Sequence, residues 1–237
     1  MRRNVWRRIA AALLTVILVC SLSVPAFAAT ETQAVQTQAV QTAASKKKIV
    51  FIGDSRTANL RQEQMGGKLV YDLLQQDGSV LWDFKWGAKF IDMTTTLVPR
   101  LELSGLDTID SKTKIVLWMG YNDAVGTPTA SADEYVNYYN LMSLLWEARG
   151  AKVYVVNVGP AGRLHGGATK AQQQEYKDKN KKIRAFNKTL KNGLRPEIKY
   201  IDIYANLMET DYATSDGTHY RPLTSKGIYR DVMKAVK

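Results

Sequence analysis

The feature that most constrains the fold is an alternation of short apolar segments with longer amphipathic ones throughout residues 47–237. Three of the short segments, at residues 49–52, 115–119 and 153–156, are continuously apolar and rich in β-branched side chains. Such segments are typical of strands that are covered on both faces. Amphipathic helices between strands of this kind build β-α-β units, so the alternation predicts a single α/β domain.

Two further segments complete the expected sheet. Trp82, Phe84 and Trp86 alternate with polar residues, a period of two that suits a half-exposed strand, and residues 200–203 are the fifth strand candidate. We interpret the three aromatic side chains as a core face under a helix, and a ligand-stacking stripe is the alternative. The expected architecture is a three-layer α/β/α sandwich around a mostly parallel, five-stranded sheet.

Three helices carry recognisable signals at their ends. Ser131 and Glu134 have the spacing of a capping box, and Gly150 stands where the helix that they begin would end. A second helix is expected at about residues 170–192, with one apolar stripe and a lysine-rich side that faces solvent. A last helix follows Thr224 and places its apolar side chains four residues apart.

The first residues have the features of a secretory signal peptide. Four arginines precede an apolar run at residues 9–19, and Ala26-Phe27-Ala28 follows as a cleavage site. Because the run is shorter than the roughly 18 to 20 residues of a spanning helix, a membrane anchor is the weaker alternative. We expect residues 1–28 to be removed and residues 29–46, which repeat Gln-Ala-Val-Gln-Thr, to be a flexible linker. The mature protein is therefore predicted to be secreted or extracytoplasmic, with association to the cell surface as a further option.

Composition narrows the kinds of site that the mature chain can hold. The single cysteine, Cys20, lies in the leader, so neither a disulfide nor a cysteine metal site is expected in the domain. Loss of the four leader arginines leaves 29 basic residues against 22 acidic ones, a net charge of +7. This charge would favour association with an anionic cell wall, and a role in keeping the protein soluble explains it equally well. No basic patch with interleaved aromatic residues indicates nucleic-acid binding.

Three polar clusters are expected at one edge of the sheet. Gly53-Asp54-Ser55 follows the first predicted strand, Gly120-Tyr121-Asn122-Asp123 follows the central apolar strand, and Asp216-Gly217-Thr218-His219 precedes the last helix. Ligands of open parallel sheets bind outside the carboxyl ends of the strands. We therefore expect these clusters to converge and to form the functional site.

The clusters contain the groups that acyl transfer needs. A serine becomes an effective nucleophile when a base removes its proton, and that base needs an acceptor on its other nitrogen. Asp216 and His219 can supply both functions to Ser55, whereas His165, the other histidine, lies in a glycine-rich loop. The Ser55 backbone N–H and the Asn122 side-chain amide are natural donors for an oxyanion hole.

Taken in order, these motifs resemble the sequence blocks of the SGNH (GDSL-like) hydrolases, and the resemblance covers essentially residues 47–237. It implies a flavodoxin-like fold of the SGNH hydrolase type. It also implies a catalytic triad of Ser55, Asp216 and His219 and a reaction without a metal or an organic cofactor. Because a triad base must be neutral, we expect ester hydrolysis to increase with pH through about 6 to 7.5, where histidine side chains ordinarily lose their proton.

The resemblance further implies that a mid-chain glycine adds its backbone N–H to the oxyanion donors Ser55 and Asn122. Gly87, which follows the aromatic strand segment, fits this role best. The other glycines of the region are Gly66, Gly67 and Gly78. Arg56 departs from the family pattern, in which an apolar residue follows the serine. A surface ion pair is the expected explanation for Arg56, and contact with an anionic substrate group is the alternative.

The sequence thus predicts a secreted serine esterase that hydrolyses short acyl esters, chiefly acetyl esters, on a carbohydrate or cell-wall glycan. Tyr121, Arg163 and Tyr220 lie beside the motifs and are candidate substrate contacts, although packing explains the two tyrosines equally well. Three alternatives remain: a catalytically silent glycan-binding module on the same fold, a lipase or thioesterase of the same family, and a nucleotide-binding protein. The last lacks the required glycine spacing in its candidate loop, residues 159–167.

Overall fold

The computed structural model describes residues 48–68, 74–104 and 109–237. These residues form a six-stranded sheet with the strand order β2-β3-β1-β4-β5-β6, in which β2 and β3 are antiparallel and all other neighbours are parallel. The strands are β1 (Lys48–Gly53), β2 (Leu74–Asp77), β3 (Val80–Phe84), β4 (Thr113–Trp118), β5 (Lys152–Val156) and β6 (Lys199–Ile201). The predicted α/β class and the mostly parallel sheet are confirmed.

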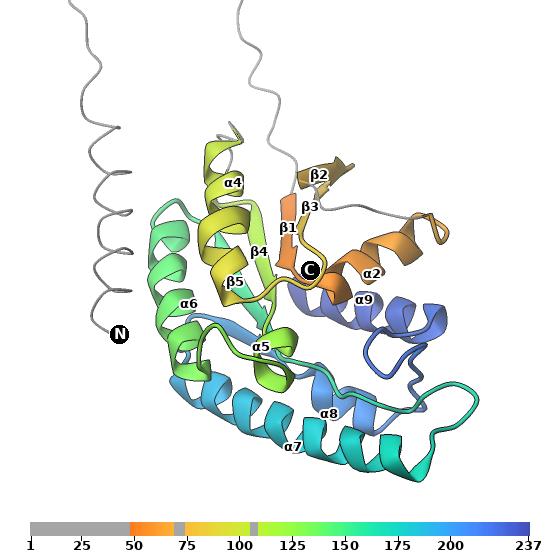
Figure 1. Cartoon of the computed structure of the whole chain (residues 1–237). Coiled ribbons are helices and arrows are strands. Elements are labelled where there is room, and N and C mark those ends of the chain that lie inside the picture. The colour runs from red at the N-terminus through yellow and green to blue at the C-terminus, as the bar shows by residue number, and fades with distance from the viewer. Residues whose placement is uncertain (1–47, 69–73, 105–108) are drawn as a thin grey trace, which may run out of the picture. The chain divides into compact units, whose positions relative to one another are not determined.

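Helices cover both faces of this sheet, which gives the expected three layers (Figure 1). One face carries α2 (Ser55–Gln64), α8 (Ile203–Met208) and α9 (Pro222–Val236). The other face carries α3 (Phe90–Asp92), the π-helical turn η1 (Met93–Leu97), α4 (Val98–Leu103), α5 (Tyr121–Val125), α6 (Ala132–Glu147) and α7 (Lys170–Gly193). No helix within the described residues is both long and apolar enough to cross a membrane.

Burial on both faces explains the continuously apolar strands. In β1, Val50 and Ile52 belong to the core under α4, α6 and α7, whereas Ile49 and Phe51 belong to the core under α2 and α9. Successive side chains of a strand point to opposite faces, so each face needs its own apolar set. The central strand therefore requires an uninterrupted apolar run, as its sequence provides.

The structure adds β2, a sixth strand that the sequence prediction omitted. Its sequence, Leu-Gln-Gln-Asp, is polar, and it has no apolar alternation from which a strand can be recognised. It lies at the edge of the sheet, where it pairs with one neighbour only, and backbone hydrogen bonding to β3 holds it there. Edge strands tolerate polar side chains because one of their sides faces solvent.

The prediction of a half-exposed aromatic strand was wrong for β3, all five residues of which are buried. Asp83, which the alternation placed on the exposed side, is 0 % exposed because Arg100 of α4 covers it and pairs with its carboxylate. Trp86 lies beyond the end of β3, and its side chain is 37 % exposed. The alternation thus ends before Trp86, and the aromatic residues do not share one environment.

The helix ends mostly follow the sequence signals. Ser131 and Glu134 form the predicted capping box of α6, and Thr169 begins α7 in the same way. The predicted strand at residues 200–203 is shorter, because Asp202 caps α8 through a bond from the Ala205 amide. The proposed leader and linker lie outside the described residues.

Candidate active site

Ser55 is the first residue of α2, directly after β1, so β1 delivers its side chain to the carboxyl edge of the sheet. Asp54 caps this helix by accepting a hydrogen bond from the Arg56 amide at 2.9 Å. A side chain at Gly53 would lie 1.8 Å from the Thr57 hydroxyl and 2.8 Å from a backbone oxygen at the end of β4. Only glycine therefore allows the tight passage from strand to helix that places Ser55.

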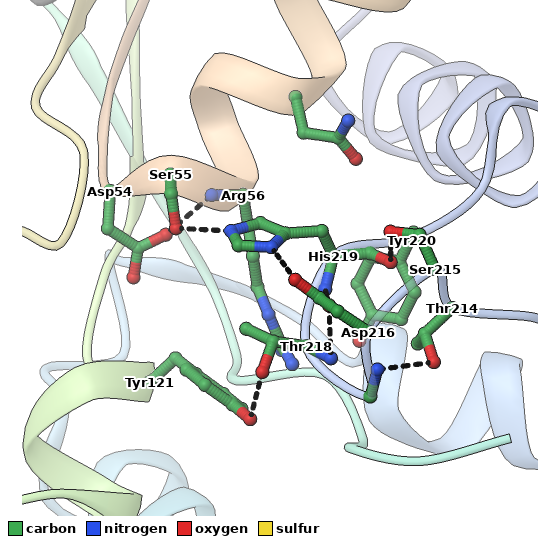
Figure 2. Close-up of polar contacts among 12 residues, drawn as sticks. Asp54, Ser55, Arg56, Tyr121, Thr214, Ser215, Asp216, Thr218, His219 and Tyr220 are labelled. Atoms are coloured by element: carbon green, nitrogen blue, oxygen red, sulfur yellow. Dashed lines mark hydrogen bonds and ion pairs between the residues drawn. The ribbon is translucent and has the colours of Figure 1, made fainter. Parts of the chain in front are cut away.

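The structure brings Ser55, His219 and Asp216 together in one hydrogen-bonded line (Figure 2). His219 Nε2 lies 3.0 Å from Ser55 Oγ, and His219 Nδ1 lies 2.7 Å from Asp216 Oδ2. Ser55 and His219 are 164 positions apart in the chain. This geometry matches that of a relay in which a carboxylate orients an imidazole and the imidazole accepts the serine proton.

The loop that carries His219 is folded back on itself. The Ser215 amide donates to the His219 carbonyl at 2.9 Å, and Thr214 Oγ1 accepts from the Gly217 amide at 3.1 Å. Gly217 has a φ of +85°, and a side chain there would lie 2.4 Å from the Tyr176 hydroxyl on α7. The loop is thus fixed both by its own hydrogen bonds and by close packing on α7.

The Asp216 carboxylate is held in its charged form. Its partial burial opposes ionisation, but hydrogen bonds from the His219 amide, the His219 ring and the Thr218 amide outweigh burial and lower the pKa. Its Oδ1 accepts from the Thr218 and His219 amides at 2.9 and 2.7 Å, which leaves Oδ2 for the ring. The Asp216 side chain is 53 % exposed, so solvent reaches this end of the relay.

Asn122 and the Gly87 segment lie next to each other. Asn122 is the second residue of α5, the helix that follows β4, and its Nδ2 donates to the Ala88 carbonyl at 2.9 Å. A primary amide nitrogen carries two N–H groups, so one remains for a further acceptor. Gly120 makes this turn possible: its φ is +115°, and a side chain there would lie 2.7 Å from the Phe186 ring.

Gly87 is the mid-chain glycine that the structure places at this edge. It has a φ of +69° and directly follows Trp86, whose indole centroid lies 5.6 Å from the His219 ring centroid. The alternatives are elsewhere: Gly66 and Gly67 follow the C-terminal end of α2, and Gly78 lies in the turn before β3. The role of Gly87 as an oxyanion donor remains a prediction.

Asp123 organises the surroundings of Asn122. Its carboxylate accepts hydrogen bonds from the Phe90 amide at 2.7 Å and from the Tyr135 hydroxyl at 2.6 Å, and also from Thr129. The bonds join α3, α5, α6 and the loop between α5 and α6. Asp123 therefore orders the loop that follows Asn122.

Arg56 forms no surface ion pair, contrary to the sequence expectation. Its side chain is buried, and its guanidinium donates to the carbonyls of Gly159 and Pro160 at 2.7 and 3.3 Å. The guanidinium also lies between two rings, 3.8 Å from the Tyr121 centroid and 4.8 Å from the Tyr220 centroid. Burial also removes it from direct contact with a substrate.

The three candidate substrate contacts have partners within the protein. Tyr121 and Tyr220 are 5 % and 2 % exposed, and their hydroxyls bond to Thr218 Oγ1 and to the Pro160 carbonyl. Burial leaves them little surface for a substrate, so packing is the better explanation. Arg163 is exposed, but its guanidinium donates to the Thr210 carbonyl and lies over the Tyr212 ring. None of these contacts directs the three side chains toward the Ser55 hydroxyl.

Trp86 is the functional candidate that the sequence interpretation undervalued. Among the described residues it is the only tryptophan, tyrosine or phenylalanine with an exposed side chain. Its position beside His219 makes it a wall of the site rather than part of the core. The alternation of aromatic and polar residues continues past Phe84, so the sequence does not show that β3 ends there and that Trp86 lies beyond the strand.

The buried Asp54 carboxyl gives a testable dependence of stability on pH. Burial raises its pKa from 3.8 to about 6, against the opposing effects of the Arg56 amide and guanidinium. The folded protein therefore binds this proton more tightly than the unfolded chain, so its stabilising contribution is present below about pH 4 and is lost as the pH rises through about 6. Two pKa units correspond to about 3 kcal/mol.

We therefore expect urea unfolding to show that wild type loses more stability than Asp54→Asn between pH 4 and pH 7, by up to about 3 kcal/mol. The asparagine keeps an oxygen that can accept from the Arg56 amide. Asp211→Asn, at an exposed position, is the control and should parallel wild type. Equal pH dependence of wild type and Asp54→Asn would contradict the raised pKa.

Within the described ranges, no group of three or more histidine, aspartate or glutamate side chains is arranged so that it could hold a metal ion. The groups that the site does offer are a hydroxyl, an imidazole, a carboxylate and a side-chain amide. These are the groups of nucleophilic acyl transfer.

Comparison with known proteins identifies the fold. No family model matches the chain. No curated protein matches it either. Solved structures do match, among them a lipase/acylhydrolase from Enterococcus faecalis, with 16 % identity, a TM-score of 0.56, and coverage of 80 % of this chain and 95 % of the other.

Two further matches have similar extents. A candidate SGNH hydrolase from Slackia heliotrinireducens is 16 % identical, with a TM-score of 0.56 and coverage of 81 % of this chain and 100 % of the other. A carbohydrate acetylesterase family member from Sinorhizobium meliloti is 13 % identical, with a TM-score of 0.53 and coverage of 80 % and 97 %. With its order of elements and its sheet, the described part of the chain has the fold of the SGNH hydrolases.

Proposed function

We propose that this protein is a serine esterase that transfers a short acyl group from an ester to Ser55 and then to water. The observation that carries the proposal is the continuous line from Ser55 Oγ through the His219 ring to Asp216, with contacts of 3.0 and 2.7 Å. A helix start and a strand exit hold the nucleophile at the edge where ligands of such sheets bind.

The first half of the reaction forms the acyl-enzyme. His219 Nε2 accepts the Ser55 hydroxyl proton as Oγ attacks the carbonyl carbon of the ester, and Asp216 stabilises the imidazolium that results. The tetrahedral intermediate carries negative charge on its oxygen, which the Ser55 and Gly87 backbone N–H groups and the Asn122 amide would stabilise. Collapse of the intermediate breaks the ester C–O bond, and the departing alcohol takes the proton from Nε2.

The second half releases the acid. Water gives a proton to His219 Nε2 and attacks the acyl carbon, and collapse of the second intermediate returns the proton to Ser55 Oγ. The relay thus ends in its starting state. Every proton that leaves the serine or the water passes through one imidazole, which explains why the position of His219 matters at each step.

We further propose that the substrate is an O-acetyl ester of a carbohydrate, such as a cell-wall or external glycan. The exposed Trp86 indole beside His219 supports this substrate, because aromatic faces pack against the C–H faces of sugar rings. The carbohydrate acetylesterase relative has the same fold, although at 13 % identity. A lipase or thioesterase remains the alternative for the same site.

Secretion and contact with an anionic cell wall also remain proposals. The outer side of α7 supports the contact, because Lys177, Lys181, Arg184, Lys188 and Lys191 are exposed. Their spacing of three or four residues places them on one face of the helix, and α7 itself lies at the outside of the domain (Figure 1).

The proposed activity is tested with a fluorophosphonate probe and a short-chain aryl acetate. We expect the mature domain to be labelled and to release acetate, and Ser55→Ala to do neither. Inertness of the wild-type protein, combined with binding to a glycan, would favour the silent binding module. Acetate release from acetylated peptidoglycan and from an acetylated plant-type polysaccharide would then separate the two carbohydrate sources.

The role of Trp86 gives a separate prediction. We expect Trp86→Ala to raise KM for an acetylated oligosaccharide about tenfold, because stacking contributes on the order of 1 kcal/mol and burial adds to it. KM for ethyl acetate, which has no ring to stack, should change less than twofold. Leu103→Ala, at a position that is 82 % exposed, is the control for loss of surface apolar area. Equal changes for both substrates would exclude a sugar platform.

A further inference from the structure

Arg56 is a buried cation that forms no ion pair with a carboxylate of the described residues, although the neighbouring Asp54 carboxyl is within electrostatic range. Its side chain is 2 % exposed, and its guanidinium contacts two carbonyl oxygens and two aromatic rings. Its Nε has no hydrogen-bond partner in the part of the chain that the structure describes. A buried charge is costly unless its surroundings compensate it, so its contacts merit an explanation.

The partners of Arg56 belong to the segments that carry the proposed site. Arg56 follows Ser55, and its two rings are those of Tyr121, which precedes Asn122, and Tyr220, which follows His219. The guanidinium edge holds the loop after β5 through two carbonyls at 2.7 and 3.3 Å. One planar group therefore touches three segments that are remote from its own in sequence.

Two hydroxyl bonds tie these segments to one another. Tyr121 Oη lies 3.0 Å from Thr218 Oγ1, and Thr218 directly precedes His219 (Figure 2). Tyr220 Oη donates at 2.9 Å to the Pro160 carbonyl, which also accepts from Arg56. The residues on both sides of His219 are thus attached to the assembly around the guanidinium.

We propose that Arg56 is a positioning residue that holds the His219 loop and the α5 start against the Ser55 helix. This assignment rests on the proposed esterase function. Arginine suits the role because it has two flat faces for the rings and N–H groups at its edge for the carbonyls. A lysine ammonium offers neither flat face, and an apolar residue can fill the space without tying the segments together.

The decisive variant is Arg56→Leu. Arg56 forms no ion pair among the described residues, so its replacement by leucine leaves no buried carboxylate without its salt-bridge partner, and we expect this variant to fold. We expect kcat to fall about 10- to 100-fold, because a displacement of about 1 Å at a reacting group has effects of this size. KM should stay within about threefold, since Arg56 does not touch the substrate. Arg56→Lys should likewise lower kcat and leave KM nearly unchanged.

Arg61→Leu is the matched control. Arg61 lies on the same helix, is also 2 % exposed, and pairs with Asp77 of β2 at 2.9 Å. Its loss should lower the unfolding midpoint while kcat stays within about twofold of wild type. A merely structural role for Arg56 would give the pattern of Arg61→Leu, with an effect on stability and none on kcat.

Tyr121→Phe covers the case in which Arg56→Leu does not fold. It keeps the ring over the guanidinium and removes only the hydroxyl bonded to Thr218. We expect kcat to fall about three- to tenfold at unchanged KM, and an unchanged kcat would overturn the assignment. Wild-type kcat in Arg56→Leu would overturn it also while leaving the esterase intact. A wild-type protein inert to probe and ester would overturn the proposed function and this assignment with it.

Discussion

Replacement of Ser55 by alanine is expected to lower kcat/KM for an aryl acetate by at least about 10⁴-fold and to abolish fluorophosphonate labelling. The change removes the Oγ that lies 3.0 Å from His219 Nε2 and with it the atom that is proposed to form the acyl-enzyme. Oxyanion donors and the binding surface would remain, so a small residual rate over water is expected. The fold should be retained, because the deleted atom lies at a helix start and is hydrogen-bonded to His219 rather than to the core.

Ser143→Ala is the control for this experiment. Ser143 is a buried serine of α6, and its hydroxyl bonds to Asn140 and Arg195 on the far side of the sheet from α2. Its loss should affect stability by about 1 kcal/mol and leave kcat/KM unchanged. If Ser55→Ala kept more than a tenth of the wild-type kcat/KM, Ser55 would not be the nucleophile.

Asp216→Asn is expected to lower kcat/KM at pH 7 by about 10³-fold, through the tautomer of His219. The Thr218 and His219 amides both donate to Oδ1, so the asparagine carbonyl should stay there and its NH₂ should face His219 Nδ1. Nδ1 must then accept, the proton moves to Nε2, and Nε2 can no longer take the proton of Ser55. Because the Asp216 side chain is half exposed, we expect a smaller loss than for a fully buried carboxylate.

The measurement is kcat/KM for the aryl acetate, with Asp211→Asn as control. Asp211 is an exposed aspartate near the same loop and has no contact with His219. Proton NMR of the imidazole should show the change of tautomer directly. A loss below about tenfold for Asp216→Asn would mean that backbone contacts alone hold the ring, and the carboxylate would then lose its proposed role.

The parts of the site that could be read from the sequence are those set by local rules. Asp216 and His219 are three residues apart in one loop, so their contact needs no knowledge of the tertiary fold. Ser55 and Asn122 follow continuously apolar strands, and the rule that ligands bind at carboxyl ends of strands brings them together. The capping box at Ser131 and Glu134 is equally local.

The remainder depends on contacts between distant segments. Arg56 reaches carbonyls 103 and 104 positions away, and no pattern near it in the chain indicates a buried cation. The alternation in β3 predicts an exposed Asp83. The residue is buried because Arg100 of another element covers it, and a strand pattern cannot show such a contact. The polar strand β2 joins the sheet through backbone pairing with β3, and side-chain periodicity does not record such pairing.

His219, the proposed general base, lies shortly before α9, a helix without any proposed catalytic side chain. This helix packs on α2, and Ser225 Oγ donates to Asn59 of α2 at 2.9 Å. At the C-terminal end of α9, the Lys114 ammonium of β4 donates to the Val236 and Lys237 carbonyls. Because α9 follows the His219 loop and packs on the helix that begins with Ser55, a substitution that loosens α9 is expected to change the separation of Ser55 and His219, although it lies outside the proposed site.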